Sequence, residues 1–165
     1  MTRIGLISDT HGYFDSQLVP ILTDCDEIWH AGDLGTLAVY QELIKLKKPV
    51  RIVSGNIDGH DIRSFAPVEL NWSIEKKRIY MTHIGGYPGR YPGKIKAYLT
   101  ESKPDVFVCG HSHILRVIYD RQQKLLYLNP GSCGKEGFHK VRTALRFVID
   151  GEKIEKMEVI ELGTN

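Results

Sequence analysis

Short apolar runs alternate with amphipathic segments over the first third of the chain. Ile4–Ser8, Glu27–Ala31 and Val50–Val53 are predicted to be buried strands. Asp15–Thr23 has helical spacing, and Thr36–Leu46 is a second predicted helix whose first residue is a suitable N-cap. Two strand–helix units followed by a strand predict parallel pairing with right-handed crossovers.

The rest of the chain is richer in strands. Val68–Ile74 and Arg78–Thr82 flank a polar turn and predict a hairpin. Gly85–Gly93 is too rich in glycine and proline for regular structure and is a candidate for a mobile flap over a site, whereas Lys94–Glu101 permits a helix. Further strands are predicted at Val106–Cys109, Ile114–Asp120, Leu125–Asn129, Thr143–Ile149 and Ile154–Ile160. We expect an α/β fold and one domain over residues 1–165.

Composition narrows the class of protein. A chain of 165 residues that is 42% hydrophobic can bury a core of its own. The net charge of +2 and the scattered lysines and arginines argue against a nucleic-acid partner. No apolar stretch is long enough for a membrane span or a signal peptide. The three cysteines are widely spaced and odd in number, so we expect no disulfides and a cytoplasmic location.

Seven polar residues suited to binding metal follow the predicted strands in five clusters. They are Asp9, His11, Asp33, Asn56, His83, His111 and His113. Any one cluster alone reads as a turn or a structural histidine, but strand ends in an α/β sheet converge on one crevice, so the set together predicts a metal centre. On extended backbone, residues two apart point the same way, as both Asp9 with His11 and His111 with His113 would need.

The donor set also indicates which metal and which chemistry to expect. Mixed imidazole and carboxylate ligands suit manganese, nickel, iron, cobalt or zinc better than magnesium or calcium. Asp33 could bridge two divalent ions, and Gly32 before it would let the backbone pass close to them. Two ions about 3.5–4 Å apart can share a hydroxide that attacks a phosphoester in line. No protein nucleophile is then needed, so Ser132 need not be catalytic.

The ordered motifs Asp9-Thr10-His11, Gly32-Asp33, Gly55-Asn56, His83 and Gly110-His111-Ser112-His113 resemble those of the calcineurin-like metallophosphoesterase superfamily. The small size and the Asn129-Pro130-Gly131-Ser132 loop are similar to its minimal, YfcE-type phosphodiesterases. The resemblance implies two mixed β-sheets packed as a sandwich and flanked by helices. It implies two metal ions, with Mn²⁺ as the first choice.

The same resemblance assigns the ligands. One ion would be held by Asp9, His11, Asp33 and His113, and the other by Asp33, Asn56, His83 and His111. The second set also supplies the catalytic candidates. We expect a metal-dependent phosphodiesterase that acts on a small or nucleotide-derived phosphodiester. The alternatives are a phosphomonoesterase and a protein-interaction scaffold, as in the retromer subunit of this fold; self-association into a homo-oligomer stays open.

One position departs from the pattern of the superfamily. Many members have a histidine directly after the asparagine ligand, where this chain has Ile57. An aliphatic side chain cannot transfer a proton, so esters with good leaving groups are favoured unless water, Asp58 or His60 substitutes. For Asp58 a turn or capping role is the stronger expectation. We expect His30 to support the Asp33 turn from behind, and His60 and His139 to be exposed in polar loops.

Overall fold

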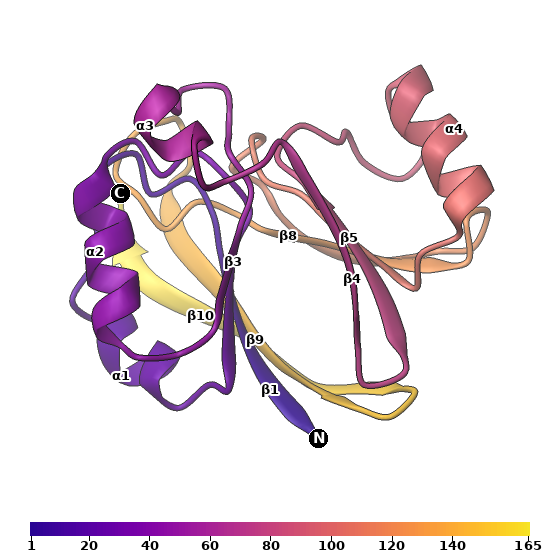
Figure 1. The fold of residues 1–165 in the computed structure, drawn as a ribbon, viewed down its shortest axis with the longest axis horizontal. Helices are drawn as coiled ribbons and strands as arrows, with labels where there is room; N and C mark the ends of the chain where they lie inside the picture. The colour runs from indigo at the N-terminus through magenta and orange to yellow at the C-terminus, as the bar shows by residue number, and fades with distance from the viewer.

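The computed structural model describes residues 1–165 and contains two five-stranded sheets that face each other (Figure 1). Sheet A consists of β10 (Lys153–Thr164), β9 (Val141–Asp150), β1 (Thr2–Ile7), β2 (Glu27–His30) and β3 (Val50–Ile52), in that order. The β1, β2 and β3 strands are parallel, as predicted, and β9 and β10 are antiparallel to their neighbours. Sheet A is therefore mixed.

Sheet B is also mixed. Its order is β4 (Glu69–Ile74), β5 (Lys77–Thr82), β6 (Val106–Val108), β8 (Leu125–Pro130) and β7 (Leu115–Asp120). The predicted hairpin is present as the antiparallel pair β4–β5, whereas β5, β6 and β8 run parallel. The edge strand β7 pairs antiparallel with β8.

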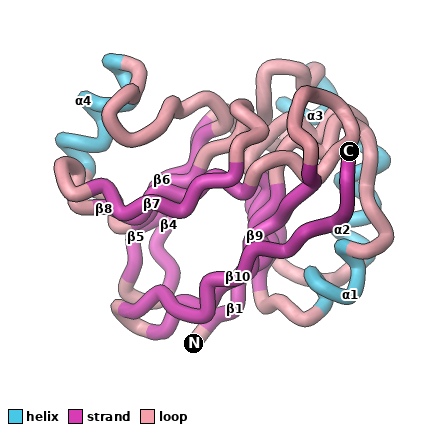
Figure 2. Tube along the Cα trace, turned by 180° about the vertical axis from the view of Figure 1, so that it is seen from behind, coloured by secondary structure: helices cyan, strands magenta, loops and turns pink.

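Helices cover the outer faces of both sheets. The α1 (Leu18–Thr23) and α2 (Leu37–Lys45) helices lie on sheet A, α4 (Gly93–Ser102) lies on sheet B, and the short α3 (His60–Arg63) lies beside the loops at one end, as Figures 1 and 2 show. The predicted α/β sandwich flanked by helices is confirmed. No helix of the chain has the length and apolar character that crossing a membrane requires.

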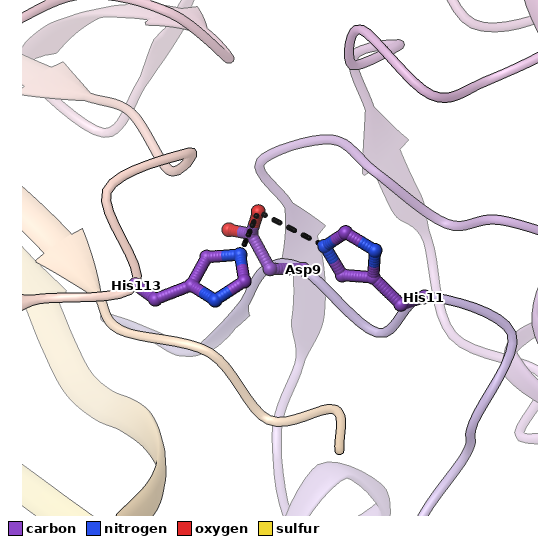
Figure 3. A group of neighbouring side chains, drawn as sticks. All are labelled: Asp9, His11 and His113. Atoms are coloured by element: carbon purple, nitrogen blue, oxygen red, sulfur yellow. Dashed lines mark ion pairs between the residues drawn. The ribbon is translucent and has the colours of Figure 1, made fainter. Parts of the chain in front are cut away.

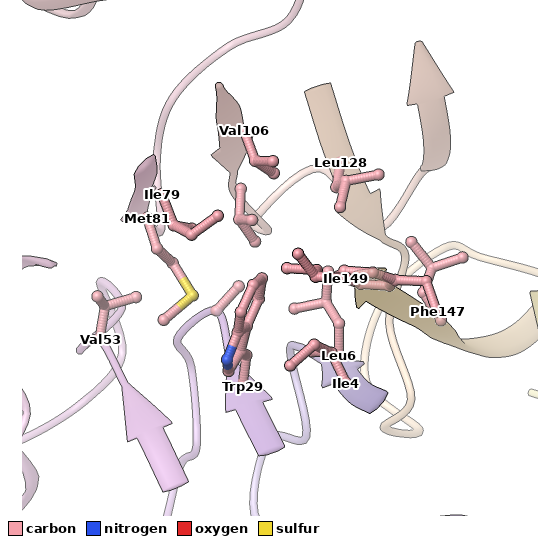
Figure 4. Packing of buried hydrophobic residues seen from close by; sticks show 13 residues of the cluster. Ile4, Leu6, Trp29, Val53, Ile79, Met81, Val106, Leu128, Phe147 and Ile149 are labelled. Carbon is pink, nitrogen blue, oxygen red and sulfur yellow. The ribbon is translucent and has the colours of Figure 1, made fainter. Parts of the chain in front are cut away.

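The main core fills the space between the sheets (Figure 4). Ile4 and Leu6 of β1 point into it, whereas Ile7 points to the helices on the other face, which is the alternation of a strand. Trp29 lies at the centre, with its ring 4.9 Å from that of Trp72 and 5.6 Å from that of Phe147. Because both faces of sheet A are covered, β1 is buried and carries no polar side chain from Ile4 to Ile7.

Several local predictions differ from the structure. The first helix begins at Leu18 rather than at Asp15, and the α3 helix was not predicted. Thr36 is the N-cap of α2, but its side chain makes no capping hydrogen bond. The glycine- and proline-rich segment packs against sheet B, where the Tyr127 hydroxyl donates to Gly86 O (2.6 Å) and the Tyr91 hydroxyl donates to Asp120 Oδ2 (2.8 Å). All three cysteines are buried and free.

Candidate metal centre

The seven predicted ligands lie in loops at the carboxyl ends of five strands, but these strands belong to two sheets. The loops after β1, β2 and β3 come from sheet A, and those after β5 and β6 come from sheet B. The expectation of a crevice within one sheet was therefore wrong. Because the sheets pack face to face, their parallel strands end side by side and bring the five loops together.

The first group of donor atoms consists of Asp9, His11 and His113, which lie within 4.8 Å of one another (Figure 3). His113 Nε2 is 3.1 Å from Asp9 Oδ1, and His11 Nε2 is 3.7 Å from the same oxygen. Asp9 is fully buried, while the imidazoles close the site toward solvent.

The second group consists of Asp33, His83 and His111, again within 4.8 Å of one another. His83 Nε2 is 3.1 Å from Asp33 Oδ2 and 3.1 Å from Asn56 Oδ1, so Asn56 joins this group. Asp33 Oδ2 is also 3.6 Å from His11 Nε2 of the first group. Asp33 thus stands between the two groups, as a bridging carboxylate would.

In each of the two carboxylates, one oxygen accepts hydrogen bonds from neighbouring protein groups, and the other oxygen faces the candidate ligands. Asp9 Oδ2 accepts hydrogen bonds from the Ser8 hydroxyl (2.5 Å) and from the His111 N–H (3.1 Å). Asp33 Oδ1 accepts from the Ile57 N–H (3.1 Å). The free oxygens, Asp9 Oδ1 and Asp33 Oδ2, are those that face the histidines.

His83 is likewise held through one ring nitrogen, which leaves the other nitrogen facing the candidate ligands. His83 Nδ1 lies 2.7 Å from Ala31 O, and because a carbonyl only accepts, Nδ1 carries the proton. The lone pair of His83 Nε2 then points at Asp33 Oδ2 and Asn56 Oδ1, which are acceptors too. A ligating histidine in a protein is typically held in this way through its other ring nitrogen.

His113 is held by His139, which was expected to be exposed in a polar loop. His139 is buried rather than exposed, because its Nε2–H donates to Gly134 O (2.9 Å) and its Nδ1 lies 3.3 Å from His113 Nδ1. With its proton on Nε2, His139 accepts from His113 Nδ1–H and leaves the lone pair of His113 Nε2 facing Asp9 Oδ1. No local sequence pattern predicts this contact, since the two residues are 26 positions apart.

The donor atoms fit divalent cations, as two unpaired buried atoms show. Asp9 Oδ1 and His11 Nε2 are buried without a hydrogen-bond partner. A buried polar atom without a partner is costly, and acceptors that face one another need a positive charge between them. The nitrogen and oxygen donors are those that manganese, iron, nickel, cobalt and zinc accept.

The same electrostatics shift the acid–base equilibria. Burial raises the pKa of Asp9, but contacts with His11 and His113 outweigh it and hold this pKa well below its usual range. Burial lowers the pKa of His83, but the hydrogen bond that its protonated ring donates to Asp33 and the charges of Asp9 and Asp33 raise this pKa above the usual value. The site therefore attracts positive charge, and protons and metal ions compete for it.

Five of the seven candidate ligands have left-handed backbone, which corrects the expectation of extended segments. The φ angles are 54° at Asp9, 47° at His11, 57° at Asp33, 66° at His111 and 57° at His113. Such angles are uncommon outside glycine and cluster at functional sites. They turn the chain sharply after each strand, which brings the paired side chains together by a route that two-residue alternation did not describe.

Two glycines are required by close approach. At Gly32, where φ is 98°, a Cβ would lie 2.6 Å from His83 Nδ1, which agrees with the expected passage of backbone beside the site. At Gly110, a Cβ would lie 2.1 Å from the Ser8 hydroxyl oxygen and 2.7 Å from Asp9 Oδ2. Any side chain at these positions would displace a ligand or its support.

The turns that carry the ligands have their own supports. His30 is fully buried, accepts from the Gly32 N–H (3.2 Å) and contacts the Thr10 hydroxyl (2.9 Å), so it supports the Asp33 turn as expected. Burial lowers the pKa of His30 to about 4. Asp58 accepts from the N–H groups of Gly55 (2.7 Å) and Gly35 (2.9 Å), which is the expected turn role.

Ser132 also has a supporting contact rather than a free hydroxyl. Its side chain is buried and donates to Asp9 O (2.9 Å). His60 is exposed, as expected, at the start of α3. Ile57 is 45% exposed beside the second group, so nothing at this position replaces the missing histidine as a proton donor.

Comparison with known proteins places this geometry in context. Residues 2–152 match the calcineurin-like phosphoesterase superfamily domain. A probable metallophosphoesterase of Mycoplasma pneumoniae is 31% identical over 136 residues, which cover 80% of this chain and 79% of the relative. Two solved structures share the fold. Vps29 of Chaetomium thermophilum has a TM-score of 0.81 at 18% identity, over 100% of this chain and 91% of that one. A novel archaeal phosphodiesterase has a TM-score of 0.69 at 24% identity, over 97% and 99% of the two chains.

Proposed function

Because this chain belongs to the calcineurin-like phosphoesterase superfamily, we propose that it is a metal-dependent phosphodiesterase with two divalent ions in its centre. The observation that carries this proposal is the pair of donor groups that share Asp33, with their lone pairs directed inward. Asp9, His11, Asp33 and His113 would hold one ion, and Asp33, Asn56, His83 and His111 the other. Mn²⁺ is the first candidate.

The chain's own residues would orient the ester and the ions. Bound divalent ions supply a water molecule of lowered pKa and positive charge for the phosphoryl oxygens. Asp33, Asn56, His83 and His111 lie at the more open group, where Asn56 and His111 are exposed to solvent and can meet the ester. Asp9 and Asp33, held by their second oxygens, keep the donor atoms fixed while the ester binds.

The kind of ester that we expect this site to hydrolyse follows from the lack of a proton donor for the leaving group. Ile57 cannot protonate a leaving group, and Asp58 is fully engaged by two backbone N–H groups. Esters whose leaving group departs unprotonated, such as aryl diesters, should therefore react fastest. A small or nucleotide-derived diester fits a centre that opens at Asn56 and His111. The solved structure described as an archaeal phosphodiesterase supports the diester choice.

The test is hydrolysis of bis(4-nitrophenyl) phosphate beside 4-nitrophenyl phosphate with Mn²⁺, Ni²⁺, Co²⁺, Zn²⁺ or Mg²⁺. We expect faster hydrolysis of the diester, with two ions bound per chain by elemental analysis. Asp33→Asn is the internal control and should lose both activity and the paired stoichiometry. Faster turnover of the monoester would favour a phosphomonoesterase, and hydrolysis of neither ester would reject both enzyme functions.

A protein-interaction scaffold is the second candidate, and one surface favours it. At the edge strand β7, Val117 and Tyr119 are exposed on one face and Ile118 on the other, and exposed apolar side chains at an unpaired edge are typical of contact sites. Vps29 has the same fold. Purified protein that retains no metal and hydrolyses no ester, but captures a partner through β7, would support this function instead.

A further inference from the structure

A cleft opens directly beside the second group of candidate ligands. It has a volume of about 300 Å³ and is lined by Ser54, Gly55, Asn56, Arg63, Val68, Thr82, His83 and Ile84. Asn56 and His83 form one of its walls, so a group bound in the cleft would adjoin an ester held at the centre. The volume lies at the lower end of the range for small-molecule sites.

The charge on the lining of the cleft is positive. Arg63 is its single ionised lining residue, and no carboxylate lines it. Arg63 makes no ion pair, whereas Arg51 and Arg142 pair with acidic side chains. A guanidinium without a carboxylate partner, beside candidate metal ligands, favours an anionic ligand.

The guanidinium is also held in position. Its Nε–H donates to Asp58 O (2.7 Å), and its Nη2 donates to Gly55 O (3.3 Å). Both carbonyls belong to the turn that carries Asn56. These bonds use two of the five N–H groups and leave Nη1 free to bind an anion bidentately with Nη2.

The remaining wall is apolar and open to solvent. Val68 is 65% exposed and Ile84 is 47% exposed, although both are aliphatic. Exposed apolar side chains beside a cation fit an organic group that ends in an anion. A nucleoside that carries a second phosphate has this chemistry.

We propose that this cleft binds the retained substituent of a phosphodiester, and that Arg63 recognises a second anionic group on that substituent. The inference rests on the proposed phosphoesterase function and names the class of its substrate. In the reaction, the oxygen of water bonds to phosphorus, the protons of that water pass to the solvent, and the bond from phosphorus to the opposite ester oxygen breaks. With an aryl ester, the phenolate leaves with the electron pair, and the nucleotide in the cleft keeps the phosphate.

The experiment compares two chromogenic substrates that differ by one anion. These are the 4-nitrophenyl ester of thymidine 5′-phosphate and the same ester with a 3′-phosphate. With Mn²⁺-loaded protein, we expect the 3′-phosphate to lower KM. Arg63→Leu should remove this advantage and cost roughly 10- to 100-fold in kcat/KM for the bisphosphate, the usual worth of a hydrogen bond to a charged group, and less than about 3-fold for the other ester.

The controls separate recognition from folding and charge. Arg121→Leu removes an exposed arginine in the turn between β7 and β8 and should change neither substrate's kinetics. Arg63→Gln keeps a donor for the turn, so it should preserve the melting temperature and metal content even if Arg63→Leu does not. It should still lose the preference for the bisphosphate.

The possible failures are distinguishable. If both esters are hydrolysed but neither Arg63 variant alters their ratio, the cleft proposal is overturned and the phosphoesterase function stands. If neither ester is hydrolysed, calorimetric titration of the Mn²⁺-loaded protein with both esters decides the cleft alone. Tighter, Arg63-dependent binding of the bisphosphate supports the cleft without the activity, and equal binding rejects it.

Discussion

His139 offers the sharpest test of how the centre is organised, because it touches a candidate ligand without being one. Its Nδ1 lies 3.3 Å from His113 Nδ1, and its Nε2–H is tied to Gly134 O. If this contact fixes the tautomer of His113, its loss frees the ring to rotate or to place a proton on Nε2. We therefore expect His139→Leu to weaken metal binding while leaving the seven ligands in place.

The magnitude follows from the kind of contact that is lost. Removing a residue that holds a metal-bound histidine typically costs 10- to 100-fold in metal affinity, or about 1.4–2.7 kcal/mol. His139→Asn is the matched variant, because its Oδ1 replaces Nδ1 as an acceptor. We expect His139→Asn to recover most of the affinity, to within about 5-fold of the original protein.

The assay is a competition between the protein and a metal chelator of known affinity, with Mn²⁺ or Co²⁺ as the ion. Co²⁺ also reports ligand geometry through its visible absorption, which is independent of activity. His60→Leu removes an exposed histidine and should change neither quantity. The melting temperature of the metal-free protein separates affinity from folding. Equal metal affinity for the original protein and His139→Leu would show that His139 does not position His113, and so would equal losses in the Leu and Asn variants.

Three further predictions concern the supports of the site. Because burial lowers the pKa of His30 to about 4, its neutral form is stabilising; that stability is present above the unfolded pKa of about 6.5 and is lost as pH falls toward 4. In urea unfolding, the original protein should lose about 2 kcal/mol more than His30→Gln between pH 7.5 and 5, and equal losses would contradict this. Gly110→Ala should abolish paired metal binding by elemental analysis, since its Cβ would lie 2.1 Å from the Ser8 oxygen; normal stoichiometry would show that the loop can shift. Asp58→Ala should lower the free energy of unfolding by about 2–3 kcal/mol in urea titration, because two backbone N–H groups lose their acceptor, and an unchanged value would count against that role.

Most of the strands and the set of candidate ligands could be predicted from the amino-acid sequence alone. Val106–Val108 is apolar because β6 is buried on both faces, and the ligands follow such runs directly. Strand burial and the position of a polar residue after a strand are local properties, so they are visible in one sequence. The superfamily motifs have the same local character, which is why the family could be inferred before the fold.

The way in which those residues meet depends on contacts between segments that are distant in the sequence. Sheets A and B pack face to face through contacts between distant segments, so the crevice joins two sheets, which the strand pattern alone did not show. The left-handed backbone at Asp9 and His113 depends on surrounding contacts that stabilise a conformation unfavourable in isolation. His139 reaches His113 across 26 positions, and Arg63 faces a cleft formed by four separate segments. Such contacts depend on the spatial arrangement of the whole chain, because no residue's own neighbours in sequence specify them.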